Sequence, residues 1–494
     1  MLNYDELTAA ERALWDSFRE GRWVDLRTGA PGDDDPARGE HWGPERTVRA
    51  EVVAALLLGG TAEPSGSVAS LRLAGALITG RLDLAGAEIG HLLWLKECRL
   101  EHAVSLYAAS TRTIRITSSW VPGVDAGLAR IEGHLDLEGS VMETGRLSLI
   151  NAHVAGELVL DGARISASGQ WAVFAGGLVM GGGVFCQQGF TARGGVRLLG
   201  AQLPGGLFMR GARLESPGGM ALIADNVTAT VVDLSEGFSA TGTLRLRGAQ
   251  ISDLLTLEGA TLGGSATALF GVGMQVGTFN FGLAAEPAGA VDLQGARAAV
   301  LHDRRQSWPK EVRLDGFVYD SLRSDRTLLH EDVAHRLAWI RRNPGYAPQP
   351  YEQLAACYRQ AGHDDDARRV LLAKQRHRRR TLNPLGRVWG YLLDAAVGYG
   401  YRPWLSALWM TTLWLLGSLT FSARSPIQTK AGEGAPFNPF VYTIDLLFPI
   451  GDFGQRGAWH WTGATQWLAY LLITIGWLLT TAVVAGISRT LNRN

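Results

Sequence analysis

The most regular hydrophobic pattern in the chain is a ten-residue phrase that recurs every eleven residues. It is ASLRLAGALI from 69, GRLDLAGAEI from 80 and HLLWLKECRL from 91, and it returns as GELVLDGARI from 156 and GTLRLRGAQI from 242. The general form, G-x-L-x-L-x-G-A-x-I/L, places apolar side chains at alternate positions, as one face of a strand requires. A fixed short period is typical of a solenoid, in which each unit buries its apolar residues against its neighbours.

The phrase also predicts which side chains point into the solenoid. We expect two leucines per phrase to point inward: Leu82, Leu84, Leu158, Leu160, Leu244 and Leu246. A glycine then suits a corner with unusual backbone angles, and the next apolar residue points inward again: Gly86, Gly162 and Gly248, then Ile89, Ile165 and Ile251. A helix is excluded because a glycine in its interior costs ~1 kcal/mol and here one recurs in every phrase.

Two phrases make one coil of about 22 residues, and the stacked coils predict a β-helix over 65–320. We take it as a right-handed β-helix because that hand is the commoner one for such repeats. The pattern fades near 121–130, 166–192 and 215–240, where we expect irregular insertions. Residues 1–64 predict a helical cap that covers the open end of the first coil, with helices over 6–19 and 44–58.

The hydrophobic period changes from two to three and four in 321–383. Val333, Leu337 and Ile340 form one helical stripe, and two further helices meet at Gly362. This helical connector resembles a tetratricopeptide-type hairpin over a single unit, which in one copy is typical of packing between domains. The second helix ends in a basic cluster that we expect to contact anionic lipid head groups, at ~1 kcal/mol per residue: Lys374, Arg376, Arg378, Arg379 and Arg380.

The last part of the chain, 384–494, predicts a membrane domain. Residues 404–421 are uncharged for 18 positions and 467–487 for 21, so as helices they cover ~27 and ~32 Å, close to the ~30 Å hydrocarbon core. Basic residues precede the first span, and Arg489 and Arg493 follow the second. The positive-inside rule therefore predicts a cell-membrane protein with both termini cytoplasmic and 422–466 outside. The apolar stripe of Val388, Trp389 and Leu392 predicts an interfacial helix before the first span.

The external loop contains a stretch too apolar for a free connection, FNPFVYTIDLLFPIGDFGQ from 437. Span, broken loop and span resemble the pore module of two-span cation channels, with IGDFGQ in place of a TVGYG-type filter. The resemblance implies a pore-like loop over 437–456 in which Asp445, Asp452 and Gln455 lie at the filter or mouth. The alternative is an amphipathic connector with ordinary surface acids.

Composition restricts the remaining functions. Gly contributes 62 of 494 residues and charged residues only 19%, which favours a turn-rich scaffold over a charged helical enzyme. Equal numbers of basic and acidic residues, 47 each, leave no overall field for nucleic acid. Cys98, Cys186 and Cys357 have no metal-site spacing, and His134 and His153 are isolated on strand phrases. We therefore predict no catalytic, cofactor-binding or metal residues.

Four stretches carry a family resemblance: YEQLAACYRQAGHDDDARRVLLAKQRHRR, VGYGYRPW, FNPFVYTIDLLFPIGDFGQ and GWLLTTAVVAGI. The whole chain is similar to actinobacterial membrane proteins with a β-solenoid repeat and a two-span hairpin, often labelled membrane-associated oxidoreductases. That label implies a redox enzyme. A dinucleotide site requires a strand, a G-x-G-x-x-G turn and a helix, whereas the run GGLVMGGGVFCQQG lies inside the repeat.

Three functions follow from these patterns. The first is a membrane-tethered cytosolic scaffold or sensor that binds a protein partner or ligand on the solenoid flank. The second is an oligomeric channel of several identical subunits, gated by the cytosolic domain. The third is the oxidoreductase implied by the family label alone.

Overall fold

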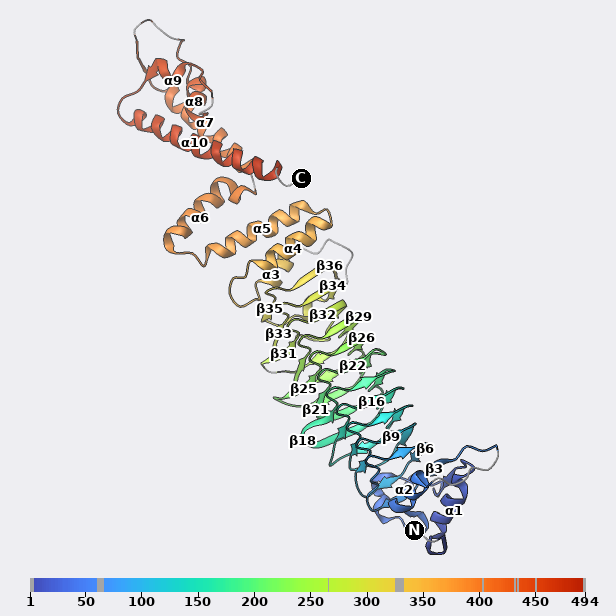
Figure 1. Ribbon diagram of the computed structural model, residues 1–494. Helices are drawn as coiled ribbons and strands as arrows, with labels where there is room; N and C mark the ends of the chain where they lie inside the picture. The colour runs from blue at the N-terminus through green and yellow to red at the C-terminus, as the bar shows by residue number, and fades with distance from the viewer. Residues whose placement is uncertain are drawn as a thin grey trace. The chain divides into compact units, whose positions relative to one another are not determined.

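The chain forms two compact units, Met1–Gln353 and Leu354–Asn494 (Figure 1). The first is a β-solenoid closed by helices at both ends, and the second consists mainly of helices. This computed structural model describes residues 4–59, 66–264, 266–324, 333–401, 404–430, 432, 435–448 and 451–491.

The solenoid has about eleven turns of parallel strands, from β3 (Ser70–Ala74) to β36 (Val318–Ser324). Its strands belong mainly to a 19-stranded and a 14-stranded sheet. Leu71 pairs with Leu93 of β6 (Leu92–Lys96), and Leu93 pairs with Ile114 of β10 (Ile114–Thr117). The phrase that begins at 69 thus stacks on the one that begins at 91, which confirms the expected two phrases per coil.

The interior of the solenoid is filled by the side chains that the phrase predicts. All six leucines expected to point inward are at most 1% exposed, and Ile89, Ile165 and Ile251 are buried. The glycine after the second leucine has a positive φ, +66° at Gly86 and +67° at Gly162, which an L side chain adopts only with strain. The repeated glycine therefore marks a left-handed corner in each coil.

Of the three predicted irregular insertions, the one near 121–130 is wrong, whereas the strands in the later two are irregular although the coils continue through them. In the first, β11 (Val124–Asp125) pairs with β8 (Val104–Ser105) and β15 (Leu147–Ser148). The later two contain most of β18 (Arg164–Phe174) and all of β26 (Thr228–Asp233), which pair with both neighbours but with shifts of register, between Ser166 and Val173 in β18 and between Ala229 and Val231 in β26. The phrase is hidden here because Leu128 and Gln188 take the positive-φ corner in place of glycine.

Along one wall of the solenoid, two short strands per coil are replaced in the later coils by one longer strand. Early coils carry two short strands on adjacent sides, for example β22 (Gln202–Leu203) and β23 (Leu207–Phe208). Both pair with β26, which runs around the corner without interruption. The longer strands that follow β26 also continue around the corner as single strands: β29 (Gln250–Thr256), β32 (Gln275–Phe281), β34 (Arg297–Asp303) and β36. The wall therefore bends within single strands in the later coils.

The N-terminal cap contributes strands as well as helices. α1 (Ala9–Phe18) lies within the expected helix, but the second expected helix, 44–58, is wrong in its first six residues. These form a 3₁₀ turn and β2 (Thr47–Arg49), and only α2 (Ala50–Leu58) is helical. β2 pairs with β4 (Leu77–Thr79), and β1 (Val24–Asp25) pairs with β3. The cap thus covers the unpaired edge of the first coil with strands of its own.

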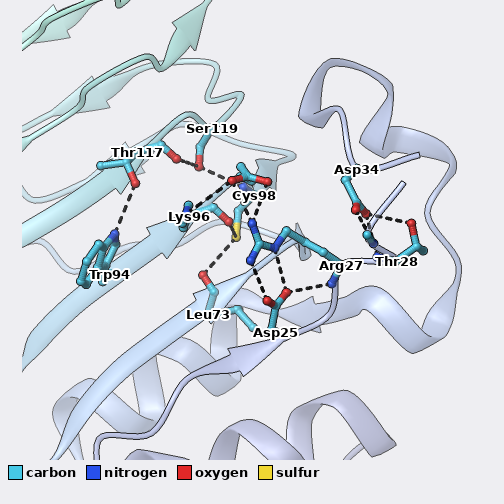
Figure 2. A network of polar contacts seen from close by, with 12 residues as sticks. Asp25, Arg27, Thr28, Asp34, Leu73, Trp94, Lys96, Cys98, Thr117 and Ser119 are labelled. Atoms are coloured by element: carbon cyan, nitrogen blue, oxygen red, sulfur yellow. Dashed lines mark hydrogen bonds and ion pairs between the residues drawn. The ribbon is translucent and has the colours of Figure 1, made fainter. Parts of the chain in front are cut away.

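Polar contacts fasten this cap to the first coils (Figure 2). The Arg27 guanidinium donates to Asp25 at 2.7 and 2.9 Å and to Glu97 at 3.0 and 3.1 Å. The Asp34 carboxylate accepts from the backbone N–H groups of Thr28 and Gly29 at 2.9 and 2.8 Å. Because Glu97 follows β6, the bridge through Arg27 ties cap and solenoid together.

The opposite end of the solenoid is covered by α3 (Val333–Ile340) and the start of α4 (Gln349–Gln360). Arg336 donates to both Asp303 oxygens at 2.8 Å, in a site where the two side chains are 3–4% exposed. Gln349 accepts from the Gly316 N–H and donates to the Phe317 carbonyl, each at 3.0 Å, and Gln353 donates to the Tyr319 carbonyl. Side-chain amides thus satisfy backbone groups of the last coil, so this part of the predicted connector acts as a cap.

The second unit contains α5 (Asp364–Arg379), α6 (Pro384–Val397), α7 (Trp404–Ser422) and α10 (Ala464–Leu491). Two shorter helices lie between the last two, α8 (Pro439–Leu447) and α9 (Gln455–Ala458). α7 and the 464–481 part of α10 are long and apolar enough to cross a membrane. Arg493, Pro449 and Ile450 lie outside the described residues.

Candidate functional site

An open groove of about 740 Å³ runs along the bent wall of the solenoid. It crosses seven consecutive strands of one sheet, β19 (Val179–Met180), β22, β26, β29, β32, β34 and β36, which pair in this order. Six strand spacings of about 4.8 Å make it about 29 Å long.

One side of the groove is a ladder of polar side chains in strict register. Its members share the first position of their strands and are all exposed: Gln202, Thr228, Gln250, Gln275 and Arg297. Sequence reasoning missed this ladder, although a signal is present. Gln202 and Gln250 take the variable position of the G-A-x-I/L phrase, and Gln275 stands in the related GMQV.

The other side of the groove is lined by small residues where the strands turn the corner. Ser252 and Asp253 of β29 form an irregularity, because Ile251 and Leu254 pair with Val276 and Thr278, which are only two positions apart. A Cβ atom built on Gly277 would lie 2.6 Å from the carbonyl oxygens of Ser252 and Asp253. Only glycine fits at position 277. The extra residue in β29 bends this strand, as β-bulges commonly do beside binding sites.

A second candidate surface lies on α5 and α6 and includes the predicted lipid-binding cluster. The Asp394 carboxylate of α6 accepts from Arg376 at 3.0 Å and from Arg379 at 3.1 Å. Burial opposes ionisation of Asp394, but the hydrogen bonds from these arginines hold its pKa below the usual value. The Arg379 guanidinium also lies over the Tyr391 ring, 3.8 Å from its centroid. Arg376 and Arg379 therefore clamp α6 to α5.

The other three basic residues of the predicted cluster are placed differently. Arg378 and Arg380 are exposed, and Lys374 is half-buried. Sequence reasoning treated all five cations alike and missed the clamp. The signal was Asp394 itself, which is the one acidic residue in the sequence between Ala367 and Gly432.

α6 also presents an unusually apolar face to the outside of the second unit. Leu385 is 83% exposed, and Val388, Trp389 and Leu392 are each more than half exposed. Their spacing of three, four and seven residues puts them on one side of the helix. At its far end α6 contacts α7, because the Trp409 indole N–H donates to the Ala395 carbonyl at 3.0 Å. The helix is thus anchored on one face and apolar on another.

Between the two candidate spans, α8 contacts both α7 and α10. A Cβ atom on Gly417 of α7 would lie 2.6 Å from the Thr443 methyl group, and one on Gly476 of α10 would lie 2.3 Å from the Leu447 carbonyl oxygen. At about 1.5 Å per residue, Gly476 is about 18 Å along α10 from Ala464. The C-terminal end of α8 therefore lies deep between the two helices.

The structure brings two of the three predicted pore-loop residues, Asp445 and Gln455, into contact and leaves the third, Asp452, exposed. Asp445 is fully buried and accepts from the backbone N–H groups of Phe453, Gln455 and Arg456 at 3.1, 3.1 and 2.8 Å. Gln455 is buried too, and its side chain donates to the Pro436 carbonyl and accepts from the Asn438 N–H. Asp452 is exposed and accepts from the Gly454 N–H at 2.8 Å. Asp445 and Gln455 thus hold the loop together.

The cysteines and possible metal ligands give no further site. Burial raises the pKa of the Cys98 thiol to about 12, and this thiol lies 3.3 Å from the Lys96 carbonyl oxygen (Figure 2). Cys186 is also fully buried, with a raised pKa. Within the described ranges, no group of three or more His, Cys, Asp or Glu side chains is arranged to hold a metal ion. Comparison with known proteins finds no match among family models, curated proteins or solved structures.

Proposed function

We propose that the chain is a membrane-tethered scaffold, anchored by α7 and α10, whose solenoid binds a ligand or partner in the groove. The observation that supports the membrane tether is that the apolar side chains of α7 and α10 are mostly exposed and not buried. Only 22% of the apolar window of α7 and 28% of that of α10 are buried, and large side chains such as Trp404, Leu416 and Trp467 are more than half exposed. A core helix of a water-soluble protein buries most of such a window, whereas lipid solvates it.

The charge distribution supports an orientation with both termini in the cytoplasm. Arg378 and Arg380 are exposed just before α6, where the anionic inner leaflet attracts cations. The apolar face of α6 then lies in the inner interface, as an amphipathic helix does. The solenoid, which precedes this segment, is held on the cytoplasmic side in this proposal.

Cell fractionation and thiol labelling of the full-length chain test the tether and its orientation. We expect the protein in the membrane fraction after alkaline carbonate washing. A thiol at Lys430→Cys, in an exposed part of the external loop, should react with an impermeant maleimide in intact cells, and one at Arg380→Cys only after lysis. The parent chain is a suitable control because Cys98, Cys186 and Cys357 are buried. A monodisperse protein that stays in the supernatant without detergent would overturn the tether.

A second candidate function is an oligomeric channel, and the placement of α8 favours it. A short helix that penetrates between two spans is the layout of a pore loop, and such irregular backbone is tolerated where protein covers it. Asp452 is the one exposed acid of the three predicted pore residues. In this alternative, Asp452→Asn reduces cation flux into liposomes.

Flux and subunit count distinguish the channel from the scaffold. Asp445→Asn is a poor probe, because this carboxylate holds the loop through three hydrogen bonds. Asp452→Asn changes one exposed charge and leaves those bonds in place. A monomer in detergent, or liposomes without flux, would contradict a central pore, since two spans from one subunit cannot surround it.

A further inference from the structure

The chemistry of the groove is neutral along most of its length. From Met180 to Gly277 none of its lining residues carries a charge, and Arg297 and Asp320 at one end have opposite signs. A phosphorylated polymer needs a run of cations, and the groove offers only one. Nucleic acid and other polyanions are therefore poor occupants.

The glutamine ladder favours a ligand that both donates and accepts hydrogen bonds at every repeat. Each side-chain amide of Gln202, Gln250 and Gln275 has two donor hydrogens and one acceptor oxygen. A sugar hydroxyl has one donor hydrogen and two acceptor lone pairs, so it pairs with either end of the amide. Ladder positions on consecutive strands are about 4.8 Å apart along the groove.

The spacing of the ladder argues against an extended peptide as the occupant. An extended peptide advances about 3.3 Å per residue, so side chains on one face repeat at about 6.6 Å and fall out of step with the ladder. A pyranose ring in a linear glycan advances by close to one strand spacing.

We propose that the groove binds a linear, uncharged glycan along the solenoid axis, with one ring facing each coil. Gln250 and Gln275 contact ring hydroxyls beside the corner at Gly277. This inference rests on the proposed function only in taking the groove as the ligand surface. It does not depend on the tether.

Titration of the full-length protein with defined oligosaccharides tests the inference. The protein is kept in a detergent without a sugar head group, which would otherwise compete. The probes are hexamers of β-1,4-glucose, α-1,4-glucose and β-1,4-N-acetylglucosamine, followed by calorimetry. We expect at least one neutral hexamer to bind, and its trimer to bind at least tenfold more weakly because it spans half the ladder.

Two matched pairs of variants locate the binding. Thr228→Trp places a large ring in the groove, whereas Thr261→Trp alters an equivalent exposed threonine at the start of β30 (Thr261–Leu262) on the other sheet. Gln250→Ala with Gln275→Ala removes two amides, and Gln294→Ala removes an exposed amide outside the groove. We expect Thr228→Trp to abolish hexamer binding and the double variant to weaken it at least tenfold, with both controls unchanged.

The outcomes also separate this inference from the proposed function. A folded protein that binds no hexamer, or binds one equally well in Thr228→Trp and Thr261→Trp, overturns the glycan site. Binding of an uncharged Gly-Ser dodecapeptide with the same variant pattern, and of no hexamer, overturns it in favour of a peptide groove. A protein that binds the hexamer but is recovered without membranes overturns the tether and leaves the glycan site standing. Near-identical thermal transitions of each pair establish that the variants fold.

Discussion

The solenoid and the second unit (Leu354–Asn494) distribute polar and apolar side chains in opposite ways. In the solenoid, leucines fill the interior and glutamines stand outside. In the second unit, α7 and α10 expose leucine and tryptophan, while the buried set includes polar side chains: Ser406, Ser418, Thr443, Asp445 and Gln455. The proposed tether accounts for this difference, because lipid solvates exposed apolar side chains and water solvates exposed amides.

The largest effect is expected at the buried carboxylate of the solenoid's C-terminal cap. Asp303→Ala removes two hydrogen bonds from Arg336, whose charge is almost completely buried. Breaking a buried pair in this way costs about 3–5 kcal/mol. Hydrogen exchange should show the loss as faster exchange of β34 and β36. The exposed Asp315→Ala serves as control, and equal protection in both variants would contradict a structural role for this pair.

A charge on the outward face of α7 tests the contrast between the two units directly. Leu416→Arg near the helix centre should cost about 3 kcal/mol if that face meets lipid. The same change at an exposed solenoid site, Thr261→Arg, should stay within about 0.5 kcal/mol. The fraction that resists carbonate extraction measures both. If Leu416→Arg behaves like Thr261→Arg, the face of α7 is in water and the contrast fails.

A smaller effect is expected where α8 touches α10. Gly476→Ala brings a methyl group against the Leu447 carbonyl, and overpacking of this kind costs about 1–3 kcal/mol. Gly457→Ala is the matched control, because nothing lies within 4 Å of a Cβ atom there. Thermal melting in detergent, followed by tryptophan fluorescence, compares the two. A Gly476→Ala melting temperature equal to that of the control would show that α8 is not wedged between the spans.

An effect similar in size to that of Gly476→Ala is expected from a pH dependence of the N-terminal cap. Burial opposes ionisation of Glu11, but hydrogen bonds from Arg49 and from the Thr8 N–H lower its pKa to about 2. Because this folded pKa lies below the usual Glu value, the stabilisation is complete above about pH 4.5 and disappears as the pH falls toward 2. Allowing for solvent screening at Arg49, we expect about 2 kcal/mol. Hydrogen exchange of α1 and β2 should follow this titration in the parent chain and lose it in Glu11→Gln.

The solenoid coil could be predicted from the sequence because each ten-residue phrase has leucines at the inward positions and, in most phrases, a glycine at the corner. The groove could not be found in this way, because its ladder depends on the lengths of whole coils. Gln202, Thr228, Gln250, Gln275 and Arg297 are neighbours in space, yet 26, 22, 25 and 22 residues separate them along the chain. Because these separations are unequal, a search for a fixed sequence period does not detect that the five side chains are aligned on neighbouring strands.

In the second unit, too, the sequence predicts the helices but not the contacts between single side chains. Hydropathy placed the first candidate span at 404–421, and α7 covers Trp404–Ser422. The roles of single acids depended on tertiary contacts that hydropathy does not report. The channel resemblance implies Asp445 at the filter or mouth of a pore, and the structure adds that its carboxylate holds the return of the loop. Hydropathy gives no indication that Asp394 joins α5 to α6.

Within the described residues, β1 and β2 pair with strands of the first coil, and the side-chain amides of Gln349 and Gln353 bind backbone groups of the last coil. Open β-edges template growth without limit in amyloid-like fibres, and these cap contacts oppose such growth at both ends. The number of coils therefore sets the length of the solenoid: about eleven coils spaced about 4.8 Å apart give a length near 50 Å. Inserting whole coils between the unchanged end-pieces should lengthen the molecule in equal steps without making it polymerise.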